Sequence, residues 1–239
     1  MQKIIIYDFD GTLTPYPAPK FEILEKCGIV GGASNKEYKE KALEISIKEK
    51  KNVYLALYEV FFNVIRKAGY PLNNESFSLG SKNVKYNKGV ENFLHRAKEK
   101  NIKNYLLSSG IKIFLEGTTI APYFEDIYAS TFLYNNKKEA IGVDFLMNEE
   151  NKVEAIKDIL KKNNLSDNNC SSIIYIGDGL TDLKAMEFIK KNKGTNILVY
   201  TKEDSEVVSI MKEKGIIHKY FKADYEENSE LSKYIDQIQ

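Results

Sequence analysis

Several features that would place this chain in a special class are scarce or absent. Its 239 residues include no tryptophan, two cysteines and two arginines. No apolar run approaches the roughly 18 residues needed to span a bilayer. Cys27 and Cys170 are far apart and lack metal-ligand spacing, which favours reduced thiols. The opening Met1-Gln2-Lys3 leads directly into a short apolar run, so we expect no signal peptide and a cytoplasmic protein.

An excess of charge of either sign is also missing. Lys and Arg number 35 and Asp and Glu 34, giving a formal net charge of +1. A nearly neutral chain has no overall field to attract nucleic acid or an anionic membrane. The arginines, Arg66 and Arg96, are also too few for typical base recognition. We therefore expect neither nucleic acid nor membrane as a partner.

What the chain does contain is a repeated pattern of short apolar runs that end in a polar residue or glycine. Such runs, rich in β-branched residues, are typical of strands buried on both faces of a parallel sheet. Helical patterns alternate with them, which predicts an α/β fold with a doubly wound, parallel, Rossmann-like sheet. The expected strands lie at 4–7, 105–107, 173–176 and 197–200, and the expected helices at 89–100, 111–120, 152–162 and 181–191.

The stretch 15–85 interrupts this alternation. It has no convincing strand run, begins with Pro15, Pro17 and Pro19, and shows helical patterns near 35–50 and 52–68. We interpret it as an inserted helical cap, with 1–14 and 86–239 forming the catalytic α/β core. Within that core, 127–147 predicts a β-hairpin around Asn135-Asn136, supplementary to the sheet.

Paired carboxylates follow two of the predicted strands. Asp8 and Asp10 follow the first, and Asp178 and Asp182 follow the third, within "GDGLTD". Two carboxylates about 4 Å apart repel by roughly 4 kcal/mol at an effective dielectric near 20. A fold keeps such a pair if a positive group lies between them or if one carboxylate performs chemistry. Ligands of parallel sheets bind beyond the carboxyl ends of the strands, so all four acids should converge there.

Residues suited to phosphate occur at the same predicted edge. Ser108 and Ser109 precede Gly110 where a strand is expected to give way to a helix, and helix N-termini bind phosphate. Lys152 follows Asn151, the expected N-cap of a helix. A lysine in a first helical turn opposes the macrodipole, which suggests that its ammonium group is directed at an anion. Carboxylates in this number suit Mg²⁺ together with a phosphate oxygen, and an Asp nucleophile beside a second Asp suits phosphoryl transfer.

These residues resemble, in order, the four motifs of the haloacid dehalogenase superfamily. The matching segments are "DFDGTLT", the strand end at Ser108, Lys152 and "GDGLTD", and they span the predicted core, about two-thirds of the chain. The resemblance implies that Asp8 is the nucleophile and Asp10 the general acid/base. It also implies Mg²⁺ bound by the Asp8 carboxylate, the Asp10 backbone carbonyl and Asp178, with Asp182 in support. Ser108 and Lys152, with the adjacent Ser109, would then hold the phosphoryl group.

The insertion resembles the helical cap of the phosphoserine-phosphatase-like branch. The dehalogenases that name the superfamily lack the second aspartate, so Asp10 favours phosphate over carbon–halogen chemistry. Serine phosphate itself is not implied, because Arg66 cannot be matched to the substrate-binding arginine of those enzymes.

The sequence therefore predicts a Mg²⁺-dependent phosphatase that acts on a small phosphorylated metabolite through an aspartyl-phosphate. A phosphomutase acting on a sugar phosphate would use the same core residues. A phospho-accepting signalling module would also combine acids, Ser or Thr and Lys on a parallel sheet, but in another order and without the insertion. Neither the metabolite nor the oligomeric state can be read from the residues.

Overall fold

A computed structural model describes residues 2–15, 22–29, 35–166, 168–201 and 205–237. Pro17 and Pro19, at the start of the predicted insertion, lie outside these ranges. The strands are β1 (Ile4–Tyr7), β2 (Lys103–Ile111), β3 (Asp126–Tyr134), β4 (Ala140–Phe145), β5 (Ile173–Gly177), β6 (Thr195–Tyr200) and β7 (Lys219–Lys222). The helices are α1 (Glu22–Lys26), α2 (Lys36–Glu49), α3 (Val53–Lys67), α4 (Asn74–Ser78), α5 (Val90–Glu99), α6 (Lys112–Glu116), α7 (Glu149–Lys162), α8 (Leu183–Lys191), α9 (Glu206–Glu213) and α10 (Glu230–Gln237).

The strands form one sheet in the order β4-β3-β2-β1-β5-β6-β7. All neighbouring pairs are parallel except β3 and β4. The predicted doubly wound α/β fold is confirmed. β1 lies between β2 and β5, with Tyr7 in register with Leu106 on one side and Ile176 on the other. The carboxyl ends of these three strands therefore meet at one edge of the sheet.

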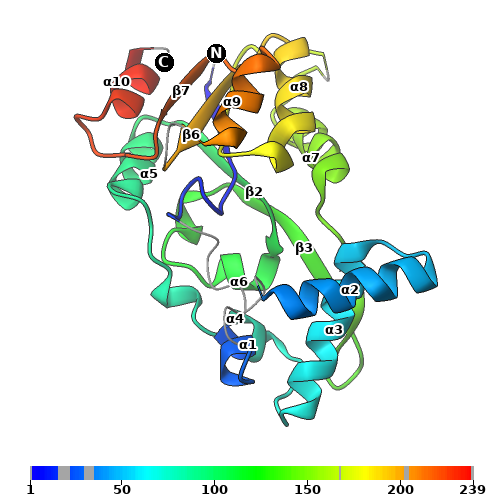
Figure 1. Cartoon of the computed structure of the whole chain (residues 1–239). Coiled ribbons are helices and arrows are strands. Elements are labelled where there is room, and N and C mark those ends of the chain that lie inside the picture. Colours follow the sequence, from blue (N-terminus) through cyan, green and yellow to red (C-terminus); the bar gives the residue numbers. More distant parts are fainter. Residues whose placement is uncertain (1, 16–21, 30–34, 167, 202–204, 238–239) are drawn as a thin grey trace.

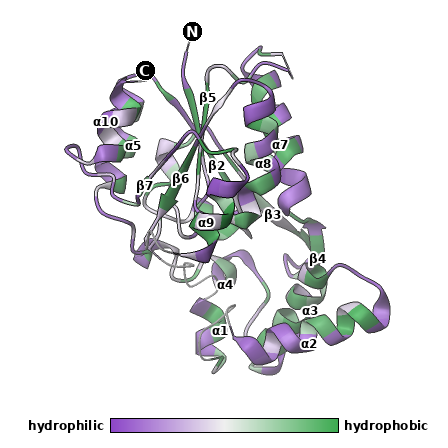
Figure 2. Cartoon of the chain, turned by 45° about the horizontal axis from the view of Figure 1, so that its top comes forward, coloured by the Kyte–Doolittle hydropathy of each residue, from purple (hydrophilic) through white to green (hydrophobic). Residues whose placement is uncertain are grey.

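Alternate residues of the central strands pack into two separate hydrophobic clusters. Ile5 and Tyr7 belong to the cluster that includes α5 and α10, and Ile4 and Ile6 to the one beneath α7, α8 and α9. Figure 1 shows these helices on the two sides of the sheet, and Figure 2 shows the strands between them as mainly hydrophobic. Burial on both faces explains why the strands appear in the sequence as continuous apolar runs.

Helices α1 to α4 occupy the long interval between β1 and α5 and lie beyond the sheet (Figure 1). The two helices predicted near 35–50 and 52–68 are present as α2 and α3. An aromatic cluster of Phe62, Phe77 and Phe132 joins this segment to β3, with ring centroids 4.6–5.7 Å apart. Helices α3 and α4 therefore pack against the β3–β4 hairpin. Within the described ranges, no helix combines the length and apolar character that a membrane crossing demands.

Three local predictions need correction. The hairpin is present, but its first strand, β3, is an integral member of the parallel sheet beside β2. β2 extends through Ser108–Gly110, where its register with β3 shifts, so the serines lie in an irregular strand end and not at a helix start. Finally, α7 begins one turn earlier than expected, because the side chain of Asn148, not Asn151, caps it by accepting from the backbone N–H groups of Glu150 and Asn151.

Candidate active site

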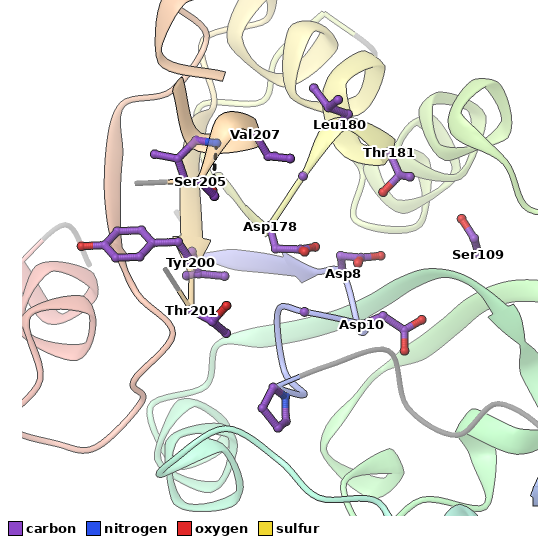
Figure 3. A pocket seen from close by; sticks show the side chains of 15 residues that line it. Asp8, Asp10, Ser109, Asp178, Leu180, Thr181, Tyr200, Thr201, Ser205 and Val207 are labelled. Atoms are coloured by element: carbon purple, nitrogen blue, oxygen red, sulfur yellow. Dashed lines mark hydrogen bonds between the residues drawn. The ribbon is translucent and has the colours of Figure 1, made fainter. Parts of the chain in front are cut away.

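The carboxyl ends of β1 and β5 place two carboxylates side by side. Asp8 directly follows β1, and its backbone N–H donates to the Ile176 carbonyl of β5 at 2.9 Å. Asp178 directly follows β5. Figure 3 shows the carboxylates of Asp8 and Asp178 next to each other, with Asp10 on the other side of Asp8. The expected convergence of acids from two strands is therefore present for these three residues.

Lys152 bridges two of the four acids. Its Nζ lies 2.9 Å from Asp8 Oδ1 and 2.6 Å from Asp182 Oδ1. The lysine side chain is 1% exposed, that of Asp8 7% and that of Asp182 0%. Buried charges of this kind persist only when they are paired. Lys152 reaches this position from the first turns of α7, as its unfavourable place relative to the helix dipole suggested.

Asp182 is held by a second donor, which the sequence did not reveal. The Tyr175 hydroxyl, from within β5, donates to Asp182 Oδ1 at 2.7 Å. Asp182 occupies the N-cap position of α8, yet its side chain makes no capping bond. Its Oδ2 has no hydrogen-bond partner among the described residues. The carboxylate is therefore turned inward, toward Lys152 and Tyr175.

The electrostatic consequence is a cluster with too little positive charge. Burial raises the pKa of Asp8 from its ordinary 3.8 to about 7, with Asp182 and Asp10 adding to the rise and Lys152 opposing it. Burial, together with the charges of Asp8 and Asp182, raises the pKa of Asp178 to about 8. Burial lowers the pKa of Lys152, but the two carboxylates outweigh this and raise it above its ordinary value. One ammonium group among these carboxylates leaves a net negative site.

Backbone close to the acids is held in a form that requires glycine. Gly11 has φ of +76°, and a Cβ on it would overlap the Asp178 carboxylate. A side chain here would therefore be strained and would also displace an acid. The next residue, Thr12, contacts the same carboxylate from its hydroxyl, with Oγ1 3.4 Å from Asp178 Oδ1.

The turn after Asp10 is anchored from two distant parts of the chain. The Thr12 carbonyl accepts from Asn87 Nδ2 at 2.8 Å and from the Tyr225 hydroxyl at 3.1 Å. The Asn87 backbone N–H also donates to the Leu13 carbonyl at 2.8 Å. All three donors are buried or nearly so, which fixes the path of the chain immediately after the acids.

The acids open into a pocket of about 580 Å³. Asp8, Asp10 and Asp178 line it together with Gly11, Ser109 and Thr181. Its other wall comes from the end of β6 and the start of α9, including Tyr200, Thr201, Ser205 and Val207 (Figure 3).

The two serines predicted to bind phosphate differ in position. Ser109 lines the pocket, whereas Ser108 is 1% exposed and its Oγ accepts from the Gly110 backbone N–H at 3.0 Å. Lys152 and Asp182 do not line the pocket. Lys152 contacts Asp8 directly, and Asp182 is linked to Asp8 through Lys152. Thr181 and Tyr175 were missed, because a lone threonine in a turn and a tyrosine in an apolar run carry no distinguishing pattern.

The donor set fits a hard divalent cation. Asp8, Asp178 and Asp182 each offer a carboxylate oxygen, and these oxygens lie within 4.8 Å of one another. Oxygen ligands and uncompensated negative charge are the conditions under which Mg²⁺ is bound. Asp8 and Asp178 face the pocket, while Asp182 is already engaged by Lys152 and Tyr175, so the first two are the better placed ligands.

A family model described as haloacid dehalogenase-like hydrolase matches residues 5–187. This range contains both acid pairs, both serines, Lys152 and the whole of the helical insertion. The chain belongs to the haloacid dehalogenase-like hydrolase family. The predicted family is thus confirmed. No curated protein matches the sequence.

Solved structures of the family share the fold at low identity. A family hydrolase from Salmonella enterica serovar Typhi is 19% identical, with a TM-score of 0.64 over 92% of this chain and 67% of its own. A substrate-bound phosphoserine phosphatase is 18% identical, with a TM-score of 0.62 over 100% and 99%. A predicted phosphatase from Clostridium acetobutylicum is 18% identical, with a TM-score of 0.58 over 99% of each chain. These likenesses extend across the helical insertion, so the chain shares its fold with a phosphoserine phosphatase and with other hydrolases of the family.

Proposed function

We propose that this haloacid dehalogenase-like hydrolase is a Mg²⁺-dependent phosphatase that forms an aspartyl-phosphate on Asp8. The observation that carries the proposal is the contact of Asp8 with Lys152 at the floor of a pocket also lined by Asp10 and Asp178. A nucleophile, a fixed cation and a second carboxylate with access to the substrate are the groups that covalent phosphoryl transfer requires.

Asp8 and Asp178, with the Asp10 backbone carbonyl, would hold the metal ion. The ion supplies charge neutralisation, both for the acid cluster and for the phosphoryl oxygens. Lys152 supports the ionised form of Asp8 through its direct bond and reduces the repulsion between the nucleophile and an incoming phosphate. Asp182 supports this arrangement by holding Lys152 from the other side.

The chemistry divides between the first two acids. The Asp8 carboxylate attacks phosphorus as the substrate P–O bond breaks, and the Asp10 carboxyl gives its proton to the leaving oxygen. Asp10 then takes a proton from water, which attacks the phosphorus of the aspartyl-phosphate and releases inorganic phosphate with Asp8 restored. Ser109 lines the pocket and is the serine better placed to donate to the phosphoryl oxygens, and Ser108 supports the strand end beneath it.

The substrate we propose is a small phosphorylated metabolite, in keeping with a pocket of about 580 Å³. Serine phosphate receives no special support. Arg66 Nη2 lies 3.4 Å from the Ala140 carbonyl at the hairpin, and Arg96 is near Phe93 on α5. Neither arginine lines the pocket.

Purified protein should release phosphate from p-nitrophenyl phosphate and from at least one member of a panel of phosphorylated metabolites, phosphoserine and sugar phosphates included, when Mg²⁺ is present. Asp8→Asn should lose roughly a thousandfold or more in rate, because the amide is no nucleophile. Wild type, but not the variant, should carry an acid-stable, hydroxylamine-sensitive phosphate label.

Asp144→Asn is the matched control, since Asp144 is an exposed aspartate on β4, away from the pocket, bonded to the Thr131 hydroxyl. Full activity in Asp8→Asn would refute the proposal. An isomeric sugar phosphate in place of free phosphate would identify a mutase. A stable label without turnover would identify a phospho-accepting module.

A further inference from the structure

We propose that Tyr175 is a positioning residue for phosphoryl transfer, acting through Asp182 to fix the ammonium group of Lys152. This inference rests on the proposed function for its kinetic consequence, but the arrangement itself is a feature of the fold. The connected groups are the Tyr175 hydroxyl, the Asp182 carboxylate, the Lys152 ammonium group and the Asp8 carboxylate.

The first step of the argument is that Lys152 needs external support. Its side chain is long and has several rotatable bonds, and its charge is compact and makes no planar, two-point contact. Its ammonium group bonds to Asp8 on one side and Asp182 on the other, at 2.9 and 2.6 Å. Asp8 is also the proposed nucleophile, so its carboxylate loses its charge when it bonds to phosphorus. Asp182 is thus the partner that holds Lys152 throughout the reaction.

The second step is that Asp182 is itself poorly anchored without Tyr175. It lies in a short 3₁₀ turn (Leu180–Asp182) and makes no side-chain bond to the helix that follows. Its Oδ2 has no partner among the described residues, so Oδ1 carries both of its recorded bonds, one to Lys152 and one to Tyr175. Removing the hydroxyl would leave Lys152 as the single side-chain donor to this carboxylate in the described part of the chain.

The third step is that Tyr175 is a rigid reference point. It is 0% exposed and lies within β5, paired with Ile6 of β1 on one side and Asn196 of β6 on the other. The opposite side of the Asp182 carboxylate is closed by the backbone of Gly177, where a Cβ would overlap Oδ2. The hydroxyl and the glycine together confine the carboxylate, and they transmit the rigidity of the central sheet to Lys152.

The test is Tyr175→Phe, which keeps the ring and removes only the hydroxyl. We expect kcat for p-nitrophenyl phosphate to fall by roughly tenfold with little change in KM, because small displacements of a catalytic group are costly to the transition state. The matched control is Tyr105→Phe. Tyr105 is also a buried strand tyrosine in the same hydrophobic cluster, and its hydroxyl bonds to Asn163 at the other end of α7.

Tyr105→Phe should change kcat by less than about twofold, while lowering the melting temperature about as much as Tyr175→Phe does. A double-mutant cycle in kcat tests whether Tyr175 acts through Asp182. Tyr175→Phe should slow the wild type but should not slow Asp182→Ala further, and Asp182→Asn replaces Asp182→Ala if the alanine variant does not fold. Equal kcat losses in the two tyrosine variants, or additive losses in the cycle, would overturn the proposal.

An unfolding cycle needs no substrate and separates this inference from the proposed function. Tyr175→Phe and Lys152→Met are combined, and the melting temperatures of the four proteins are compared. If the two residues are linked through Asp182, the combined shift differs from the sum of the single shifts. An additive result overturns the link even in an active enzyme, and a non-additive one supports it even if the protein hydrolyses nothing.

Discussion

The two ends of α7 each carry a lysine that bridges two aspartates, in very different surroundings. At the N-terminal end, Lys152 joins Asp8 and Asp182 with 1% of its side chain exposed. At the C-terminal end, Lys162 joins Asp126 and Asp158, at 2.8 and 3.0 Å, with 46% of its side chain exposed. The contacts are alike, so the difference in burial decides what each lysine does.

Lys162, Asp126 and Asp158 form an outer triad, whose charges are screened by water. Lys152, Asp8 and Asp182 form a buried inner triad, whose charges are screened much less. Nearby cations and hydrogen bonds lower the pKa of Asp126 despite partial burial, and bonds from Tyr128 and Lys162 lower that of Asp158. At the inner triad burial raises the pKa of Asp8 to about 7 even though Lys152 opposes it. Ionising Asp8 is therefore costly to the folded protein, and Lys152 reduces that cost.

Lys152→Met tests this difference at its largest. Two buried carboxylates lose their cation, which should cost about 3–5 kcal/mol in the free energy of unfolding at neutral pH. Phosphatase activity should fall by roughly a hundredfold or more, since a fixed charge at the reacting centre is lost. Urea unfolding and p-nitrophenyl phosphate turnover measure the two effects. A variant with wild-type turnover would remove Lys152 from the proposed site.

The pH dependence of stability should have opposite signs at the two ends. Asp8 and Asp178 have folded pKa values of about 7 and about 8 against an ordinary 3.8, so between these limits the folded protein holds protons that the unfolded chain releases. In metal-free protein their contribution is therefore largest at low pH and is lost as pH rises toward 8. Asp126 and Asp158, whose folded pKa values are lowered, contribute above 3.8 and lose that contribution as pH falls.

Melting temperatures measured in EDTA between about pH 5 and 8 check this prediction. The wild type should become less stable as pH rises, and Asp178→Asn should flatten the slope. If the melting temperature of Asp178→Asn fell with pH as steeply as that of the wild type, the pH dependence could not be assigned to Asp8 and Asp178.

Lys162→Met should have the smallest effect. Exposed ion pairs contribute about 0–1 kcal/mol, so the free energy of unfolding should change by no more than that, and the change should shrink in high salt. Turnover should be unaffected, because Lys162 lies at the far end of the helix from the pocket. A loss of activity comparable to that of Lys152→Met would show that burial is not what separates the two lysines.

The sequence predicted the acids and the lysine that the structure brings together at the pocket. Asp8, Asp10 and Asp178 were recognisable because carboxylates rarely end apolar strands, and Lys152 because it stands against a helix dipole. Tyr175 could not be recognised, since a tyrosine in "IIYIG" looks like any other core residue until Asp182 is folded against it. Its role depends on a contact between two elements, which periodicity does not encode.

The same limit explains the errors in local structure. Asn151 and Asn148 both precede Lys152, and either can cap a helix, so the true start of α7 depended on how the preceding strand and turn deliver the chain. Likewise, 105–107 was read as a short strand because Ser108-Ser109-Gly110 breaks the apolar run. Pairing with β3 beyond the irregularity carries β2 on to Ile111. The pocket wall from β6 and α9 was missed because its valines, serine and threonine are common in any domain.

The bond between Asn87 and Leu13 has a consequence for how such a protein can be rebuilt. The inserted segment departs next to Leu13 and ends next to Asn87, and a single 2.8 Å hydrogen bond joins the backbones of these two residues. The Tyr225 hydroxyl and the Asn87 side-chain amide hold the point of departure at the Thr12 carbonyl. The segment between Leu13 and Asn87 therefore begins and ends at neighbouring positions on the core. Segments of other lengths and shapes could be exchanged there without altering the distance between Leu13 and Asn87, so the acids that precede Leu13 would keep their positions.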